Sequence, residues 1–338
     1  MSNRTTVTQF FLLGFSDVRE QQILQFLMFL VIYLAALVGN LLIITVIALD
    51  HHLHTPMYFF LGNLSFLDLC YISVTIPKSM ADSLTNNRVI SFSGCVTQVF
   101  LVVIFAVAEL AFLTVMAYDR YTAICRPLHY RVTMNRGACA QMAAGSWISS
   151  MICSVLHTAN TFRLHFCGSN VIAQFFCDIP QLLKISCSDT HANVIVMIAL
   201  GSLIDVVCFV WIIVSYIHIF STVMRIPSEQ GRYKAFSTCI PHLIAFCLFI
   251  STASFTYMRP RSMSSTSLDL TAAVLYCVVP PLMNPIIYSL RNKEIKSSLW
   301  KMIGRIFFSQ EKQIPHTELL VSSWNKVFPC STLCNGSG

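Results

Sequence analysis

The sequence carries little charge. Only 11% of its 338 residues are Asp, Glu, Lys or Arg, while 55% are hydrophobic and the mean hydropathy is +0.67. Soluble domains carry about 25% charged residues, so this composition excludes an ordinary soluble domain. The net charge of +7 could suggest nucleic acid as a partner. We exclude that partner because the basic residues flank apolar runs instead of forming a stripe.

The N-terminus lacks the pattern of a cleavable signal peptide. Residues 1–22 are polar and mixed in charge, without a basic start followed by a short apolar core. Residues 25–49 then contain no charged side chain, and a helix needs about 20 apolar residues to cross a bilayer. We expect this first apolar run to act as its own insertion signal.

Six further apolar runs follow, separated by turn-forming and charged residues. The seven predicted spans are 25–49, 57–80, 95–118, 139–159, 194–224, 237–258 and 269–290. The predicted fold class is therefore an all-α membrane protein, a seven-transmembrane helix bundle with a short amphipathic helix after the seventh span. Its predicted parts are an extracellular N-terminus 1–24, a seven-span domain 25–290, a membrane-surface helix 291–308 and a disordered cytoplasmic tail 309–338.

Lys and Arg predict the orientation, because they are in excess on the cytoplasmic side of a membrane protein. Of the 22 such residues, 14 fall on the side that holds the C-terminus. The other eight are Arg4, Arg19, Lys78, Arg88, Arg163, Lys184, Arg259 and Arg261. The N-terminus is therefore predicted outside the plasma membrane. Asn3 agrees, since Asn3-Arg4-Thr5 is a glycosylation acceptor only on that side.

Four of the 14 cysteines lie on the predicted outer side: Cys95, Cys167, Cys177 and Cys187. Their spacing lacks the close pairs that are typical of zinc sites. An oxidising lumen favours disulfides instead. Four cysteines allow three pairings, and the spacing alone does not choose among them.

Two acids, Asp68 and Glu109, fall inside predicted spans, where charge is costly and a functional role is the default hypothesis. With Asn40 and Asn284 they could line one polar cavity. Two interpretations stay open: a hydrogen-bonded network in which one acid is protonated, and a sodium site built from hard oxygen ligands. No other cofactor is predicted. Asp205 is a third such acid, and the sequence leaves its role open.

Motifs along the chain resemble those of the vertebrate olfactory receptors, within the rhodopsin-like G-protein-coupled receptors. They include Gly39-Asn40, 56–61 (PMYFFL), 116–125 (MAYDRYTAIC), 234–239 (KAFSTC) and 280–292 (PPLMNPIIYSLRN). The resemblance covers residue 1 to about 308. The chain departs from the family at Phe249-Ile250-Ser251, where many members have Phe-Tyr-Gly, so a hydroxyl is missing at Ile250. Its tail is also longer than in most members.

The resemblance implies disulfides Cys95–Cys177 and Cys167–Cys187, and a receptor that binds a volatile odorant and raises cAMP through a stimulatory G protein. In this interpretation Arg120 pairs with Asp119 at rest and later receives the G protein. An arginine at a helix end also occurs as a simple snorkelling side chain. The coupling residues implied are Asp119, Arg120, Tyr121, Tyr216, His242, Asn284, Pro285 and Tyr288.

The family's odorant pocket maps onto the outer halves of four spans. The positions are Val102, Val103, Ala106, Val107, Leu110, Met197, Leu200, Gly201, Ile204, Ile250, Ala253, Ser254, Tyr257, Val274, Cys277 and Val278. Ordinary helix packing gives the same spacing. The lining is apolar, with Ser254 and Tyr257 as its main polar groups, and predicts a small, neutral, mostly apolar ligand. Arg261, about one turn above Tyr257, is the alternative anchor for a carboxylate ligand.

Other classes of protein fit less well. The sequence has no metal triad or nucleophile elbow, so we do not predict an enzyme. A transporter would break its helices at matching positions in two halves, whereas Pro280, Pro281 and Pro285 gather in one span. An opsin needs a Schiff-base lysine in 269–290, and an aminergic receptor needs an acid near Val102; neither is present. A non-olfactory chemosensory receptor stays the alternative.

Overall fold

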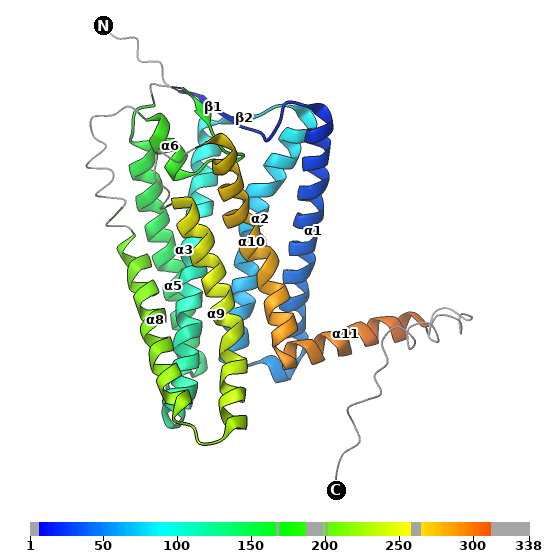
Figure 1. Ribbon diagram of the computed structural model, residues 1–338, viewed down its shortest axis with the longest axis vertical. Coiled ribbons are helices and arrows are strands. Elements are labelled where there is room, and N and C mark those ends of the chain that lie inside the picture. Colours follow the sequence, from blue (N-terminus) through cyan, green and yellow to red (C-terminus); the bar gives the residue numbers. More distant parts are fainter. Residues whose placement is uncertain (1–6, 167–168, 187–198, 200–201, 258–264, 312–338) are drawn as a thin grey trace. The chain divides into compact units, whose positions relative to one another are not determined.

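The computed structural model contains a bundle of seven long helices (Figure 1). It describes residues 7–166, 169–186, 199, 202–257 and 265–311, the last few as backbone only. The long helices are α1 (Arg19–Leu49), α2 (Pro56–Thr85), α3 (Phe92–Cys125), α5 (Arg136–Phe162), α8 (Leu203–Met224), α9 (Glu229–Tyr257) and α10 (Thr266–Arg291). By length and composition, each of them is able to cross a membrane. The predicted seven-span fold is confirmed.

The helices differ from the predicted spans mainly at their ends. α1 begins at Arg19 instead of residue 25, and α3 extends from Phe92 to Cys125. Hydropathy detects only the turns that lie in hydrocarbon, whereas a helix continues through polar turns until a cap or a proline stops it. The fifth predicted span, 194–224, is described as the continuous helix α8 from Leu203 onward.

Local sequence signals set several of the helix starts. Pro56 occupies the first turn of α2, where its missing N–H costs nothing, and Thr55 before it is extended. Side chains cap three other starts: Ser91 accepts from Gly94 N, Asn135 from Ala138 N and Ser265 from Leu268 N.

One end of the bundle carries a small sheet that an all-α expectation does not include (Figure 1). Strand β1 (Gln9–Leu12) lies between β2 (Val89–Ser91), antiparallel, and β3 (Val171–Ile172), parallel. Alternate residues of β1, Phe10 and Leu12, are buried, as expected for a strand with one covered face. We call this end of the bundle the sheet end.

A disulfide joins Cys95 at the start of α3 to Cys177, with 5.5 Å between their Cα atoms. The predicted Cys95–Cys177 pair is thus confirmed. The second pair stays a prediction, because Cys167 and Cys187 lie outside the described residues. Their neighbours Phe166 and Ser186 form an antiparallel β-bridge.

The chain divides into two compact units, Met1–Lys296 and Ser297–Gly338. The bundle belongs to the first. The described part of the second is the remainder of α11 (Lys293–Glu311). This helix was predicted at 291–308, and it continues for three residues into the segment that we expected to be a disordered tail. Asn3 and the rest of the tail lie outside the described residues.

Candidate functional site

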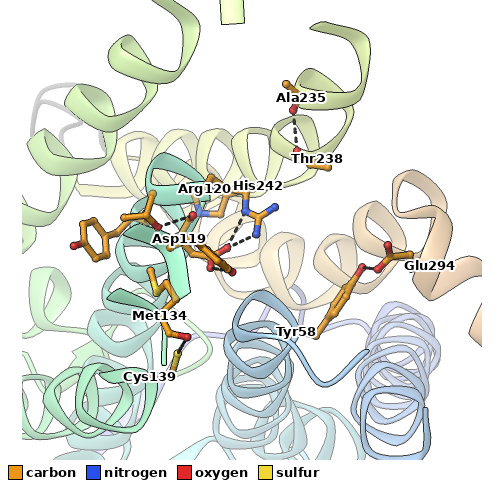
Figure 2. Close-up of polar contacts among 12 residues, drawn as sticks. Tyr58, Asp119, Arg120, Met134, Cys139, Ala235, Thr238, His242 and Glu294 are labelled. Carbon is orange, nitrogen blue, oxygen red and sulfur yellow. Dashed lines mark hydrogen bonds and ion pairs between the residues drawn. The ribbon is translucent and has the colours of Figure 1, made fainter. Parts of the chain in front are cut away.

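At the end of α3 opposite the sheet, Arg120 is held by its neighbour Asp119. The Arg120 Nε donates to Asp119 Oδ2 over 2.9 Å, and a terminal guanidinium nitrogen contacts the same oxygen (Figure 2). The other carboxylate oxygen accepts from the Tyr130 hydroxyl at 2.8 Å. Asp119 is fully buried, so both of its oxygens need such partners. The structure therefore brings Asp119 and Arg120 together as an ion pair, and its role in coupling stays a prediction.

A second polar contact links three helices beside this pair. The His242 Nε2 on α9 lies 2.8 Å from the Leu113 carbonyl oxygen on α3, and its Nδ1 lies 2.7 Å from the Tyr216 hydroxyl on α8. A carbonyl oxygen can only accept, so Nε2 carries the proton. On a neutral ring Nδ1 then accepts, and Tyr216 donates to it. Tyr216 is thereby tied to His242 instead of Arg120.

The remaining coupling residues lie around these contacts. The Tyr288 ring is buried, and it lines a small cavity together with Arg120 and His242. The Tyr121 ring lies 6.0 Å from the His218 ring and under the Arg126 guanidinium at 5.7 Å. These contacts place all the predicted coupling side chains of α3, α8 and α9 at one end of the bundle.

In the middle of the bundle, Asn284 joins the two intramembrane acids. Its Nδ2 lies 3.0 Å from Asp68 Oδ2 and 3.4 Å from Glu109 Oε1. Both acids are almost fully buried. The structure therefore brings together three of the four side chains predicted to line one polar cavity.

Asn40, the fourth, has a different partner. Its Nδ2 donates to the Pro281 carbonyl oxygen at 2.9 Å and to its own helix at Ala36. Pro285, one turn after Pro281, has no N–H to donate to that carbonyl. Gly39 allows the close approach, because a Cβ there would lie 3.0 Å from Pro285 Cγ. The Gly39-Asn40 motif and the prolines of the last span thus form one contact.

The predicted pocket positions divide into groups. Val102, Cys277 and Val278 are buried in one cluster with Phe176 and Tyr276, and Ala106 and Val274 pack against it. Val107 and Leu110 are also buried. Val103 packs instead against the cluster beneath the sheet. Ile204 is 40% exposed, and Ile250, Ala253 and Ser254 are half-buried. Met197, Leu200, Gly201 and Arg261 lie outside the described residues.

Sequence reasoning missed an acid that contacts Tyr257, one of the predicted ligand positions. Asp178 follows the disulfide-bonded Cys177 and is 3% exposed. Its Oδ1 accepts from the Ile179 backbone N–H at 2.9 Å and from the Tyr257 hydroxyl at 3.2 Å. Burial raises the pKa of Asp178 to about 6, against these two hydrogen bonds. Adjacency to a cysteine that is tied to the third span was the available sequence signal.

Comparison with known proteins decides the family. An olfactory receptor family model matches residues 29–306. The human olfactory receptors 14A16 and 14I1 are 56% and 54% identical to the chain, over 90% and 92% of it and 98% and 100% of their own lengths. The chain belongs to the olfactory receptor family. The receptor also shares its fold with squid rhodopsin, at a TM-score of 0.62 and 18% identity, over 86% of this chain and 88% of that one.

Membership establishes the general role of the receptor. It is a multi-pass membrane protein of the G-protein-coupled class, which binds odorants and acts on G proteins. The resemblance inferred from the sequence motifs is confirmed. The polar contacts around Arg120 and the cluster around Val102 therefore lie at opposite ends of one receptor bundle.

Proposed function

We propose that this receptor binds small, mostly apolar volatile ligands between α3, α8, α9 and α10 near the sheet end, and activates a stimulatory G protein that raises cAMP. The main support for this proposal is the set of partners that Arg120 and Tyr216 have in the structure. The Arg120 guanidinium is bound to Asp119, and Tyr216 is bound to His242. Receiving a G protein requires exchange of these partners, so a ligand that favours the exchanged state is an agonist.

Apolar burial sets the expected affinity. Covering apolar surface contributes about 25 cal/mol per Å², and ordering the ligand offsets part of this. A small volatile should therefore bind with a Kd near micromolar or weaker. The receptor acts by binding and not by catalysis.

A ligand panel read by cAMP, in cells that express an olfactory-type stimulatory G protein, tests the function. Aldehydes, alcohols, esters and carboxylic acids of matched carbon number form the panel. Arg120→Ala should abolish the cAMP response at equal surface level. An undiminished response would contradict the coupling role of Arg120. If only acids activate, and Arg261→Ala removes that response, the mostly apolar pocket is wrong and Arg261 is the anchor.

The orientation follows from the excess of Lys and Arg on the C-terminal side. The sheet end faces the outside of the plasma membrane, Asn3 is glycosylated, and basic α11 lies on anionic lipid at the inner surface. Glycosidase treatment should shift the wild-type receptor on a gel and leave Asn3→Gln unshifted. Glycosidase sensitivity in the Asn3→Gln receptor would contradict Asn3 as the modified site.

Asp68, Glu109 and Asn284 would hold a sodium ion. Two carboxylates and an amide offer the hard oxygens that this cation prefers, and within the described residues Asn284 Oδ1 has no hydrogen-bond partner. The ion would stabilise the resting state by binding it preferentially. Sodium chloride, compared with choline chloride, should raise the melting temperature of the purified receptor, and Asp68→Asn should remove the difference. Equal melting curves in both salts would leave the alternative of one protonated acid.

A further inference from the structure

One oxygen of Asp178 is buried without a partner. The Ile179 N–H and the Tyr257 hydroxyl both donate to Oδ1. Among the described residues nothing hydrogen-bonds to Oδ2, although Asp178 is 97% buried. A buried carboxylate oxygen without a donor destabilises the folded state, because folding removes its hydrogen bonds to water and no protein donor replaces them. Any molecule that brings a donor to Oδ2 recovers that loss.

The Tyr257 that binds this carboxylate belongs to a group of packed aromatic rings. The Tyr276 ring lies 5.8 Å from Tyr257, 6.2 Å from Tyr71 and 6.0 Å from Phe176. The Tyr257 hydroxyl, which donates to Asp178 Oδ1, connects the carboxylate to these rings. The hydroxyls of Tyr71 and Tyr276 are both buried. The group therefore offers one unpaired anionic acceptor beside buried phenol hydroxyls and aromatic rings.

The position of Asp178 is fixed from two sides. The disulfide to Cys95 ties the preceding residue to α3, and the Cys177 N–H donates to Gln98 Oε1 at 2.8 Å. On the other side, Asp178 caps the short helix α6 (Ile179–Ile185). A carboxylate held by neighbours on both sides cannot turn toward solvent to find water. Its unpaired oxygen stays buried.

We infer that Asp178 selects ligands whose polar end is a hydrogen-bond donor, an alcohol or a protonated amine, over ligands of the same size that only accept. The inference rests on the proposed function, and it specifies which polar group the ligand carries. An alcohol donates its hydroxyl proton to Oδ2, and its oxygen can accept from a neighbouring tyrosine hydroxyl. A protonated amine donates to Oδ2, neutralises the carboxylate and is attracted by the faces of the surrounding rings. An ether or a ketone leaves Oδ2 unpaired.

The test compares matched compounds on the full-length receptor. For each carbon skeleton the primary alcohol, the primary amine, the methyl ether and the ketone are measured. Readouts are cAMP in cells and thermal stabilisation of the purified receptor. Because a hydrogen bond to a charged group is strong, the alcohol or the amine should be about tenfold more potent than the ether. The potency ratio of donor to ether is the quantity of interest, since surface level does not change it.

Two variants locate the preference. Asp178→Asn replaces the anionic acceptor with an amide that also donates, so the ratio of donor to ether should fall below about threefold. Asp17→Asn, at an exposed carboxylate of the same end, is the matched control and should behave as wild type.

The outcomes separate the two proposals. Equal potency of donors and ethers, or a donor preference that survives Asp178→Asn, overturns this inference and leaves the proposed function intact. A water molecule that satisfies Oδ2 would give that result. A donor preference in thermal stabilisation without any cAMP response supports the inference and contradicts the proposed coupling. No stabilisation by any donor overturns the inference.

Discussion

The Asn40 side chain on α1 donates to the carbonyl oxygen of Pro281 on α10, over 2.9 Å. Proline at 285 removes the N–H that would otherwise close that turn of α10. Asn40 on α1 thus supplies the hydrogen bond that the Pro281 carbonyl cannot receive from within α10. Gly39 beside it lets Pro285 approach. A helix break near the middle of a membrane is tolerated where a neighbouring helix supplies such a donor.

Asn40→Leu should lower the melting temperature of the purified receptor. The variant leaves the buried Pro281 carbonyl unpaired, which costs about 1–3 kcal/mol. In the Pro285→Ala background an N–H is available at residue 285, so the same Asn40→Leu change should cost clearly less. Equal losses in both backgrounds would show that Asn40 stabilises the receptor by packing alone.

Tyr130→Phe should raise basal cAMP. The Tyr130 hydroxyl donates to Asp119 Oδ1, and burial together with the adjacent carboxylate raises the pKa of this phenol, so it stays a donor at neutral pH. Without this hydrogen bond the conformation in which Asp119 holds Arg120 is less stable. A hydrogen bond to a charged group contributes about 1.5–3 kcal/mol. Tyr233→Phe removes an exposed hydroxyl and is the control. Basal cAMP no higher than in that control contradicts the role of Tyr130.

Cys95→Ser and Cys177→Ser should each block maturation, and the double variant should be no worse than either single one, because both changes break one bond. The bond joins residues 82 positions apart, for which loop-closure entropy gives about 4.5 kcal/mol. Maturation is measured by surface labelling. Additive losses would mean that each cysteine has a second role. Peptide mapping should also find Cys167 joined to Cys187.

The receptor should become more stable as the pH falls from 7 to 5. The pKa of Asp178 is about 6 when folded and about 3.9 when unfolded, so the folded state binds the proton more tightly. The stabilisation that protonated Asp178 contributes is fully present below the pKa of the unfolded state. It is lost as the pH rises through about 6, the pKa of the folded state. The full contribution is about 3 kcal/mol, of which about 1.4 kcal/mol, the worth of one pKa unit, is gained by pH 5. The facing groups, Tyr71, Tyr257, Tyr276 and Cys277, are phenols and a thiol.

Melting temperatures of wild type and Asp178→Asn at pH 5, 6 and 7 measure this. The difference between the two proteins isolates Asp178 from the other titrating groups. In Asp178→Asn the rise in melting temperature between pH 7 and pH 5 should be smaller. Parallel curves for the two proteins would exclude Asp178 as the source of the dependence.

Tyr58→Phe and Glu294→Gln should weaken the same contact. The Tyr58 hydroxyl lies 2.6 Å from Glu294 Oε2 (Figure 2). It also lies 3.1 Å from Asn292 Oδ1, the atom that caps the start of α11. Each variant should lower the maximal cAMP response at equal surface level, because α11 begins where α10 ends beside the coupling residues. The double variant should match the more severe single one. Losses that add would place the two side chains in separate roles.

The sequence by itself determined the seven helices and the family. Bilayer thickness demands about 20 apolar residues per span, and runs of that length are visible without any knowledge of contacts. Residues of one motif lie close in the chain, so Asp119 and Arg120 were expected to pair and do so. Helix ends were less well predicted, because polar turns continue a helix beyond the apolar run.

Only the tertiary structure decided which distant side chains meet. Asn40 was expected beside Asp68 and Glu109, yet its amide donates to Pro281, because the rotation of α1 about its axis and the close contact at Gly39 direct it there. Asp178 lies in a loop with no periodicity, and its burial depends on the disulfide that holds Cys177 against α3. Hydropathy fixes where a helix crosses the membrane, whereas packing between helices fixes which atoms face each other.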